Sequence, residues 1–465
     1  MSDIGWIGTR WVLGRGGWLA AALAALGGVV VVSSGFAAPP GESQEPRVRT
    51  LSRPRQQVPV RRVALQSAGV PDLPGAAMLP QFLGAGRNNQ SADKGLAATW
   101  PDGGPKYVTK LSGLGVGFSC FSIADGRLYT AGNLEEREYV LAMNLADGSI
   151  AWKYDISRAY KNSFGDGPRS TPTLDGDRLY AVSATGDLVC LQRADGKEVW
   201  RRNIVEEYKS KIPNWGICES VLIDGDRLIC TPGGSEATLV ALDKLTGKEV
   251  WRGKSPDTDR PGYSSILPID VSGQKQYVQF TAKGVLGFRA SDGGYLWRDD
   301  SSANGTANCS APVYADGMVF TSSGYGKGAS MVQVARDGEN ATANLGYHIG
   351  EMKNHHGGLV LHEGHVYGSS DSGGFSCIEL KTGKKVWNDR SVGKGAVTFA
   401  DGKLLLRDES AGKVALIKAT PEKYEELGRL EQPDRSGSKA WTYPVVFAGR
   451  LFLRDQNDLH VYDLR

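Results

Sequence analysis

A short phrase that recurs at near-constant spacing constrains this chain more than any other feature. Each copy begins with Asp-Gly or Thr-Gly and ends in Trp five positions after the Asp or Thr. The five full copies end at Trp152, Trp200, Trp251, Trp297 and Trp387. The intervals are 48, 51, 46 and 90 residues, and a copy without Trp, Asp337–Thr342, divides the long interval. This period, filled by short apolar segments, predicts the blades of a β-propeller rather than a helical solenoid.

A second set of turns gives the number of blades. Each period holds an earlier hairpin turn, and these turns lie at 125–126, 175–176, 224–225, 272–273, 316–317, 363–364, 401–402 and 448–449. Only seven second hairpins match these eight first ones, counting a further degenerate copy at Thr420–Glu425, because the last repeat ends on a third strand, Asp458–Leu464, without a fourth. A strand near Tyr107–Leu111 can supply the missing outer strand. We therefore expect an all-β, eight-bladed propeller of four-stranded blades, closed by N- and C-terminal strands, with seven blades as the fallback.

The N-terminal region has the pattern of an export signal. Arg10 and Arg15 precede an apolar run, and small residues follow at Gly35 and Ala37. Residues 1–38 therefore fit a cleavable signal peptide, with an uncleaved membrane anchor as the alternative. Residues 39–77 are rich in Pro and Arg and predict a disordered linker, which leaves 78–465 as the propeller domain. The expected location is the periplasm or cell envelope, as a secreted protein or one tethered through its N-terminal segment.

Charge and cysteine spacing exclude several classes of function. The formal net charge is +3, of which residues 1–77 carry +4, so the rest of the chain sums to −1. Binding to nucleic acid by bulk electrostatics is therefore not expected. The six cysteines occur singly, without a Cys-x-x-Cys pair, so no metal cluster is predicted from local spacing. They are interpreted as small buried residues, with a Cys218–Cys230 pair across one hairpin as the alternative.

The candidate site is a funnel at one end of the central channel. In a propeller the first residues of the innermost strands converge there, on the face that also carries the loops between second and third strands. The polar, charged and aromatic residues at these positions, which are typical of ligand contacts, are Arg169, Trp215, Glu219, Tyr263, Asn308, His355, His356, Lys394, Arg407, Arg435 and Trp441. They predict a polar, aromatic, net-cationic funnel for an anionic or polyhydroxylated ligand, and bracing between blades is the alternative for each residue. Of His355 and His356, only one is expected to reach the axis, because adjacent strand residues face opposite ways.

The Thr/Asp-Gly-Lys-x-x-Trp phrase resembles the tryptophan-docking repeat of pyrroloquinoline-quinone-type β-propellers, over about residues 97–465. Similar repeats occur in exported quinone-repeat proteins, in quinoprotein alcohol dehydrogenases and in the propeller lipoprotein of the outer-membrane barrel assembly machinery. The resemblance implies that Trp152, Trp200, Trp251, Trp297 and Trp387 lock neighbouring blades together and are not cofactor ligands. It predicts fold more strongly than activity, because propellers support unrelated functions.

Three functions remain open. The first is a binding or scaffold module for a protein, peptide or glycan, acting through the funnel. The second is a pyrroloquinoline-quinone-dependent alcohol dehydrogenase that uses Ca²⁺, although the adjacent cysteine pair typical of that family is absent and blades of about 47 residues leave little room to enclose a quinone. The third is a hydrolase or lyase with Glu219, His355 and Asp371 as acid–base groups. No resident cofactor or metal is expected under the first, and no catalytic residue is assigned.

Overall fold

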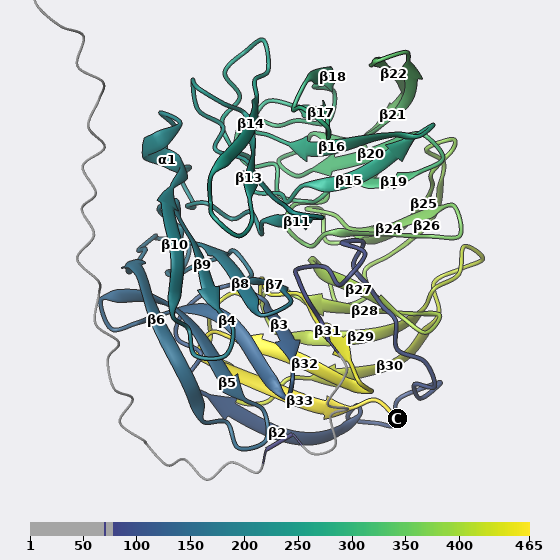
Figure 1. Ribbon diagram of the computed structural model, residues 1–465. Coiled ribbons are helices and arrows are strands. Elements are labelled where there is room, and N and C mark those ends of the chain that lie inside the picture. Colours follow the sequence, from purple (N-terminus) through teal and green to yellow (C-terminus); the bar gives the residue numbers. More distant parts are fainter. Residues whose placement is uncertain (1–68, 71–77) are drawn as a thin grey trace, which may run out of the picture. The chain divides into compact units, whose positions relative to one another are not determined.

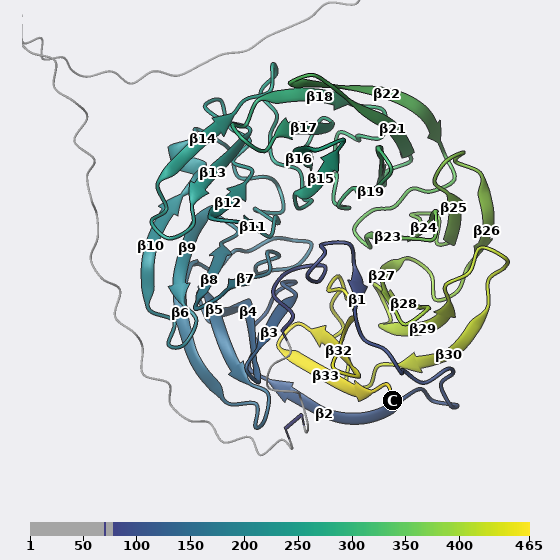
Figure 2. The same ribbon diagram turned by 45° about the vertical axis from the view of Figure 1, so that its right-hand side comes forward.

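The described part of the chain forms eight antiparallel sheets set side by side in a ring (Figures 1 and 2). The computed structural model describes residues 69–70 and 78–465, which belong to one compact unit of the chain. The eight-bladed propeller expected from the repeat is confirmed. The predicted signal peptide lies outside the described residues, as does the predicted linker apart from Gly69 and Val70. Val70 is buried, and its backbone N–H donates to the Leu145 carbonyl over 2.8 Å.

Each blade contains four antiparallel strands, and in blades 1 to 7 the first of these four along the chain is the innermost (Figure 2). Blades 1 and 2 contain β3 (Phe121–Ala124), β4 (Arg127–Leu134), β5 (Arg137–Asn144), β6 (Ile150–Arg158), β7 (Thr173–Asp175), β8 (Arg178–Val182), β9 (Asp187–Gln192) and β10 (Glu198–Asn203). Blades 3 and 4 contain β11 (Leu222–Asp224), β12 (Arg227–Cys230), β13 (Leu239–Asp243), β14 (Glu249–Gly253), β15 (Leu267–Val271), β16 (Gln274–Phe280), β17 (Val285–Arg289) and β18 (Tyr295–Asp299). Blades 5 and 6 contain β19 (Val313–Ala315), β20 (Met318–Ser323), β21 (Gly328–Asp337), β22 (Asn340–Ile349), β23 (Leu359–His362), β24 (His365–Ser369), β25 (Phe375–Glu379) and β26 (Lys385–Asp389).

The last two blades include strands from the N-terminal side. Blade 7 contains β27 (Gly395–Ala400), β28 (Lys403–Asp408), β29 (Lys413–Lys418) and β30 (Glu426–Glu431), and β1 (Gln90–Ser91) pairs in parallel with β27. Blade 8 contains β31 (Val445–Phe447), β32 (Arg450–Asp455), β33 (Asp458–Asp463) and β2 (Lys106–Ser112). The antiparallel pairing of β2 with β33 sets Leu111 opposite Leu459 and confirms the predicted closure. The helix α1 (Ile204–Glu207) follows β10, and no helix among the described residues is long and apolar enough to cross a membrane.

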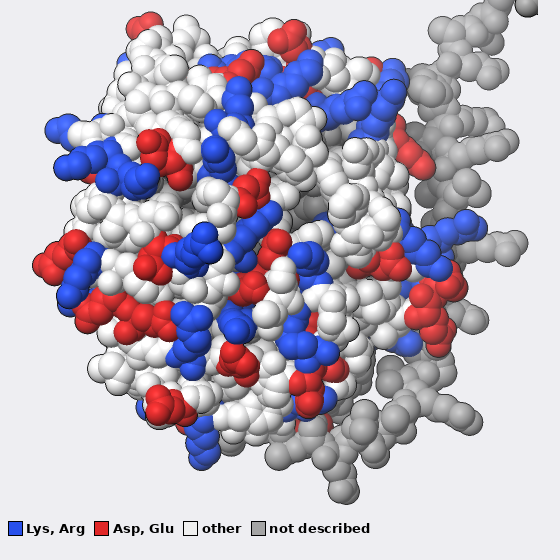
Figure 3. Space-filling view, turned by 180° about the vertical axis from the view of Figure 1, so that it is seen from behind, with Lys and Arg blue, Asp and Glu red and all other residues white. Residues whose placement is uncertain are grey.

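Tight turns explain pairs such as Asp125-Gly126 at the first hairpins, whereas in the phrase that ends in Trp the Gly alone has positive φ, for example 70° at Gly247. At the first hairpin of blade 1, Asp125 and Gly126 have φ values of 50° and 70°. Two consecutive residues with positive φ define the turn whose twist matches that of the flanking strands. The outer surface carries mixed charge, and Figure 3 shows acidic and basic side chains interspersed over one face.

The repeated tryptophans lie between blades. The indole N–H of Trp152, Trp200 and Trp387 donates to the carbonyls of Arg193, Lys244 and Thr420, each in the following blade, over 3.0–3.1 Å. The ring of Trp251 covers Gly293 of blade 4. Trp297 differs because its indole N–H bonds to Gln276 within its own blade, although its ring packs among residues of blade 5.

The stretch that precedes the propeller crosses the central channel. We call residues 78–91 the plug segment. It forms an isolated bridge between Leu79 and Ile123 of blade 1, and its β1 strand joins blade 7, which blade 8 separates from blade 1 (Figure 2). Between them the Arg87 side chain, 3% exposed, donates to the carbonyls of Ser220, Val221 and Ile266 in blades 3 and 4. The segment therefore closes one end of the channel and ties several inner strands together.

A buried acid in blade 1 predicts a measurable pH effect on stability. Glu138 on β5 is fully buried, and this burial raises its pKa from 4.5 to about 8, although the Ala184 N–H donates to it. A carboxyl group whose pKa is raised in the folded state contributes stability below its unfolded pKa and loses it as pH rises. Stability should therefore fall between about pH 4.5 and 8. We expect Glu138→Gln to raise the melting temperature at pH 8 by several degrees, with little gain at pH 5.

Differential scanning calorimetry of wild type and Glu138→Gln at both pH values measures this effect. The matched control is Glu136→Gln, since the Glu136 side chain is 79% exposed. An equal shift at pH 5 and pH 8 would contradict the assignment of a raised pKa to Glu138.

Candidate functional site

A cavity of about 230 Å³ lies where the innermost strands begin. Its wall comes from seven blades and the plug segment. The aromatic and histidine side chains that line it are Phe82, Phe118, Phe164, Trp215, Tyr263, Tyr325, His355, His356, Trp441 and Tyr443. The other lining residues are Cys120, Arg169, Cys218, Ala307 and Cys309. This cavity occupies the end of the channel at which the funnel was predicted.

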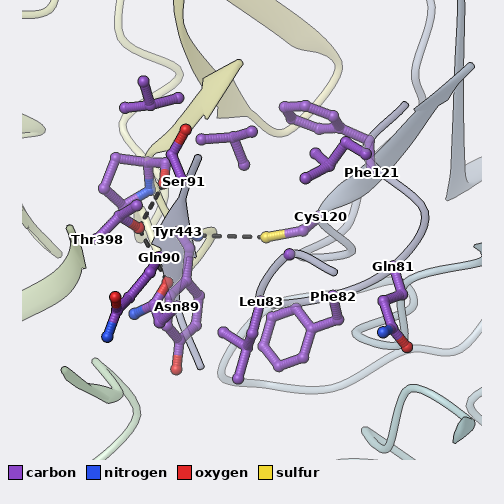
Figure 4. Close-up of a pocket in the computed structure, with 15 residues that line it drawn as sticks. Gln81, Phe82, Leu83, Asn89, Gln90, Ser91, Cys120, Phe121, Thr398 and Tyr443 are labelled. Atoms are coloured by element: carbon purple, nitrogen blue, oxygen red, sulfur yellow. Dashed lines mark hydrogen bonds between the residues drawn. The ribbon is translucent and has the colours of Figure 1, made fainter. Parts of the chain in front are cut away.

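The plug segment lies at the inner end of this cavity. Phe82 lines the cavity and packs edge-on against Tyr443, with ring centroids 5.2 Å apart. Figure 4 shows the smaller adjoining pocket along the plug segment, which shares Phe82, Cys120 and Tyr443 with the cavity; there Asn89 is joined to Thr398 of blade 7. Because the plug segment crosses the channel, the cavity has an end wall rather than opening into a continuous pore.

Ring contacts join most of the aromatic lining residues into two arcs. Phe164, Trp215 and Tyr263 form one arc, with successive centroids 5.8 and 5.3 Å apart. A second arc runs from Tyr325 through His355, His356 and Trp441 to Phe118, with successive centroids 4.7, 4.7, 5.1 and 4.8 Å apart. Aromatic walls of this kind favour flat apolar groups and the apolar faces of sugars.

One cation lies in this wall. The Arg169 guanidinium sits over the rings of Phe118 and Tyr160, at 5.1 and 5.7 Å from their centroids. Its Nη1 and Nη2 donate to the carbonyls of Gly167 and Gly165 over 2.8 and 3.0 Å. Within residues 69–70 and 78–465 no carboxylate lies within 4.0 Å of this group. Arg169 is therefore held in place by neutral partners and keeps N–H groups for a ligand.

A polar cluster beside the cavity fixes the proton on His355. Lys394 Nζ lies 2.8 Å from His355 Nδ1 and 2.7 Å from Asp371 Oδ1. A lysine ammonium can only donate, so His355 Nδ1 accepts and a neutral imidazole carries its proton on Nε2. The Lys394 ammonium and the Tyr325 N–H, which donates to Asp371 Oδ2 over 2.7 Å, outweigh the effect of burial and hold the pKa of Asp371 well below its usual value. His355 thus adds an N–H donor to the wall.

His356 forms a second close pair. Its Nε2 lies 2.5 Å from Glu409 Oε2, which also accepts from the Trp441 indole N–H over 3.2 Å. Burial lowers the pKa of His356 to about 4 despite this neighbour, so the imidazole is neutral at pH 7. Burial alone would raise the pKa of Glu409, but the His356 contact and the charges of Lys394 and Lys439 lower it to about 2. Glu409 is therefore ionised and already partnered.

The structure brings together six of the eleven predicted funnel residues in the cavity wall: Arg169, Trp215, Tyr263, His355, His356 and Trp441. Lys394 lies behind the wall in the cluster just described. Four others brace the propeller. Glu219 is buried and accepts from Thr231, and Asn308 is buried and donates to the Thr281 carbonyl. Arg407 is fully buried and bonds to Thr442 and Gln432, and Arg435 pairs with Asp455.

Two sequence expectations need correction. Both His355 and His356 line the cavity, because they lie in the loop before β23 and not on the strand whose alternation was assumed. The wall is aromatic and largely apolar rather than polar, and its one cation is Arg169, since Lys394 lies behind it and is paired with Asp371. Phe82, Phe164 and the cavity thiols were missed. Phe118 and Tyr325 could have been predicted. Phe118 precedes an innermost strand and Tyr325 lies in a loop between second and third strands, and both kinds of segment were expected at the funnel.

The cysteines are all free thiols, so the alternative of a Cys218–Cys230 disulfide is wrong. Cys218 and Cys309 line the cavity, and burial raises the pKa of both, to about 12 for Cys218. They are therefore neutral, weakly polar parts of the wall and not activated nucleophiles.

The residues around the cavity do not fit a Ca²⁺-held quinone. Ca²⁺ takes six to eight oxygen ligands, mostly carboxylates and carbonyls. No carboxylate lines the cavity, and the two nearby, Asp371 and Glu409, are bound to Lys394 and His356. Within the described residues no group of three or more His, Cys, Asp or Glu side chains is placed to hold a metal ion.

The fold and the repeat define a quinone-type β-propeller, and comparison gives the family. The PQQ_2 family model, described as outer membrane protein assembly factor BamB, matches residues 136–389, which is more than half of the chain. The chain belongs to this family.

Curated relatives are distant and longer than the matched region. The chain is 25% identical over 186 residues to quinohemoprotein alcohol dehydrogenase ADH IIB of Pseudomonas putida, covering 38% of this chain and 25% of the relative. It is 25% identical over 197 residues to BamB of Kangiella koreensis, covering 40% of this chain and 43% of the relative. The matches thus span less than half the length of either relative.

Solved structures share the fold at low sequence identity. BamB from Moraxella catarrhalis superposes with a TM-score of 0.51 at 15% identity, covering 77% of this chain and 97% of that one. Quinohemoprotein alcohol dehydrogenase ADHIIG from Pseudomonas putida HK5 superposes with a TM-score of 0.53 at 13% identity, covering 81% and 78%. At these identities the likeness establishes the propeller fold alone.

Proposed function

We propose that this chain is a binding module of the cell envelope, which holds part of a peptide, protein or glycan partner in its central cavity and does not catalyse a reaction. The observation that carries this proposal is the blind aromatic cavity on the propeller axis. Seven blades contribute to it, and its inner end is covered by the plug segment. A concave, mostly apolar site with a few polar groups is the usual form of a ligand pocket.

The size and chemistry of the cavity favour a small group of a larger partner. Its volume of about 230 Å³ lies below the range of about 300–1,000 Å³ typical of sites that enclose a whole cofactor or drug-sized molecule. One aromatic side chain, or one sugar ring, matches such a space better. Membership of the BamB-described family and the N-terminal export pattern support a place in the cell envelope.

The dehydrogenase alternative has less support. The distant similarity to ADH IIB covers a quarter of that enzyme, and the cavity wall lacks the oxygen ligands that Ca²⁺ requires. The acid–base alternative also weakens, because Glu219 is buried away from the cavity and Asp371 is held by Lys394.

A matched pair of tyrosine variants tests the proposed site. Tyr325 is 50% exposed and lies at the cavity, whereas Tyr107 is 42% exposed and lies on the outer strand β2. Calorimetric titration of the full chain with an uncharged aromatic probe, N-acetyl-L-phenylalaninamide, its carboxylate form, and the glycan probe N,N′-diacetylchitobiose should reveal saturable binding of at least one. We expect Tyr325→Ala to weaken that binding tenfold or more and Tyr107→Ala to leave it unchanged. The proposal fails if no probe binds, or if both variants weaken binding equally.

A further inference from the structure

The unpaired guanidinium of Arg169 distinguishes this cavity from a simple apolar pocket. Arg169 is stacked on aromatic rings and bonded to two neutral carbonyls, Gly165 and Gly167. A guanidinium has five N–H donors, so these two bonds leave others free. A cation that faces a largely apolar space attracts an anion more strongly than one in water, because the local dielectric is lower. No acid of the described chain supplies that anion within 4.0 Å.

The acids near the cavity are unavailable to Arg169. Asp371 and Glu409 belong to the cluster of blades 6 and 7, with Lys394 and His356. Arg169 belongs to blade 2, which is four blades from blade 6 in a ring of eight, so the two groups face each other across the axis. Buried Glu138 is the acid whose charge would act on Arg169, and its raised pKa keeps it protonated at neutral pH. The cavity thus presents positive charge without a matching negative one.

We infer that the cavity takes an aromatic group that carries a carboxylate, with the rings of the wall holding the aromatic part and Arg169 binding the anion. This inference rests on the proposed function and names the ligand class of the same site. The shared chemistry fits two sources, a free aromatic acid and the C-terminal aromatic residue of a polypeptide. Arginine suits both, because its planar fork matches the two oxygens of a carboxylate.

The test compares two ligands that differ in the anion alone. N-acetyl-L-phenylalanine is ionised at pH 7, and N-acetyl-L-phenylalaninamide is its uncharged counterpart. Calorimetric titration of the full chain should give at least tenfold tighter binding of the acid. Raising NaCl from 0.05 to 0.5 M should weaken binding of the acid and leave that of the amide unchanged, since salt screens the ionic contact. Equal affinities for the acid and the amide would overturn the inference while leaving the proposed binding module intact.

Substitutions at Arg169 test whether this side chain causes the preference for the acid over the amide. Arg169→Gln should lower the affinity for the acid tenfold or more and leave that for the amide unchanged, and Arg169→Lys should restore part of the loss. The matched control is Arg336→Gln, because Arg336 is an exposed arginine whose guanidinium also bonds to two carbonyls, those of Gly338 and Ser272. An equal loss in the Arg336 variant, or none in the Arg169 variant, would refute the role of Arg169. If Arg169→Gln does not fold, the ratio of the wild-type affinities for the acid and the amide, together with their salt dependence, still tests whether the cavity binds the anion.

A second pair of probes separates the sources. An octapeptide ending in phenylalanine with a free carboxylate is compared with the same peptide amidated at its C-terminus. Tighter binding of the free-acid peptide than of N-acetyl-L-phenylalanine indicates a polypeptide C-terminus. Tighter binding of the single amino acid indicates a free aromatic acid. Either result supports the carboxylate, and binding of the amidated peptide as tightly as its acid form contradicts it. If chitobiose alone binds, the module is a glycan binder and this inference is wrong.

Discussion

Replacing Trp200 by alanine should lower the free energy of unfolding by about 3–5 kcal/mol, the range for removing a large buried aromatic side chain. Trp200 is 9% exposed, and its ring covers Gly247 of the next blade while its indole N–H donates to the Lys244 carbonyl over 3.0 Å. Its loss would open a void between blades 2 and 3 and leave a carbonyl without its donor. Chemical unfolding followed by far-ultraviolet circular dichroism measures the change.

Val199 provides the control for this experiment, since it is the preceding residue on β10 and is 37% exposed. We expect Val199→Ala to shift the unfolding free energy by less than about 1 kcal/mol, as exposed substitutions usually do. A Trp200→Ala variant no less stable than the Val199 variant would show that the repeated tryptophans do not lock the blades.

Replacing Arg454 by methionine should have an effect of similar or larger size. Arg454 is fully buried on β32, and its guanidinium donates to the carbonyls of Ser119, Ala131 and Gly115, which belong to blade 1 or the loop before it. Methionine fills much of the space but donates nothing, and each buried carbonyl left without a donor costs about 1–3 kcal/mol. We therefore expect a loss of about 4 kcal/mol or more at the junction of the last and first blades.

The same unfolding measurement tests this prediction, with Arg252→Met as its control. Arg252 is 48% exposed and paired with Glu249, an arrangement worth at most about 1 kcal/mol at a surface. Failure of the Arg454 variant to accumulate as folded protein agrees with the prediction. An unfolding midpoint equal to that of wild type would contradict the bracing role of Arg454.

The architecture was predictable because the repeat encodes it locally. Each Asp-Gly or Thr-Gly turn fixes a hairpin, and the incomplete last repeat pointed to a strand near Tyr107 that closes the ring as β2. The end of the channel that holds the site was predictable for the same reason, because all the innermost strands begin at that end.

The side chains that reach the axis were harder to predict. Cys218 lines the cavity, whereas its neighbour Glu219 points away from the cavity and accepts a hydrogen bond from Thr231. The sequence alone did not show which of the two side chains would face the ligand. Arg407 carries a charge yet is fully buried, because Thr442 and Gln432 accept its hydrogen bonds. Phe82 reaches the cavity from the plug segment, and no local sequence pattern predicts this contact. These placements depend on tertiary partners far away in the sequence.

The central claim is that the cavity binds an organic group from a partner and is not a quinone active site. The most direct test is to titrate the full chain by calorimetry with N-acetyl-L-phenylalanine and, separately, with pyrroloquinoline quinone with and without Ca²⁺. A dye-coupled alcohol oxidation assay then follows on the same sample. The account predicts saturable binding of the aromatic acid and no alcohol oxidation. Saturable, Ca²⁺-dependent binding of the quinone with turnover of alcohol would contradict it.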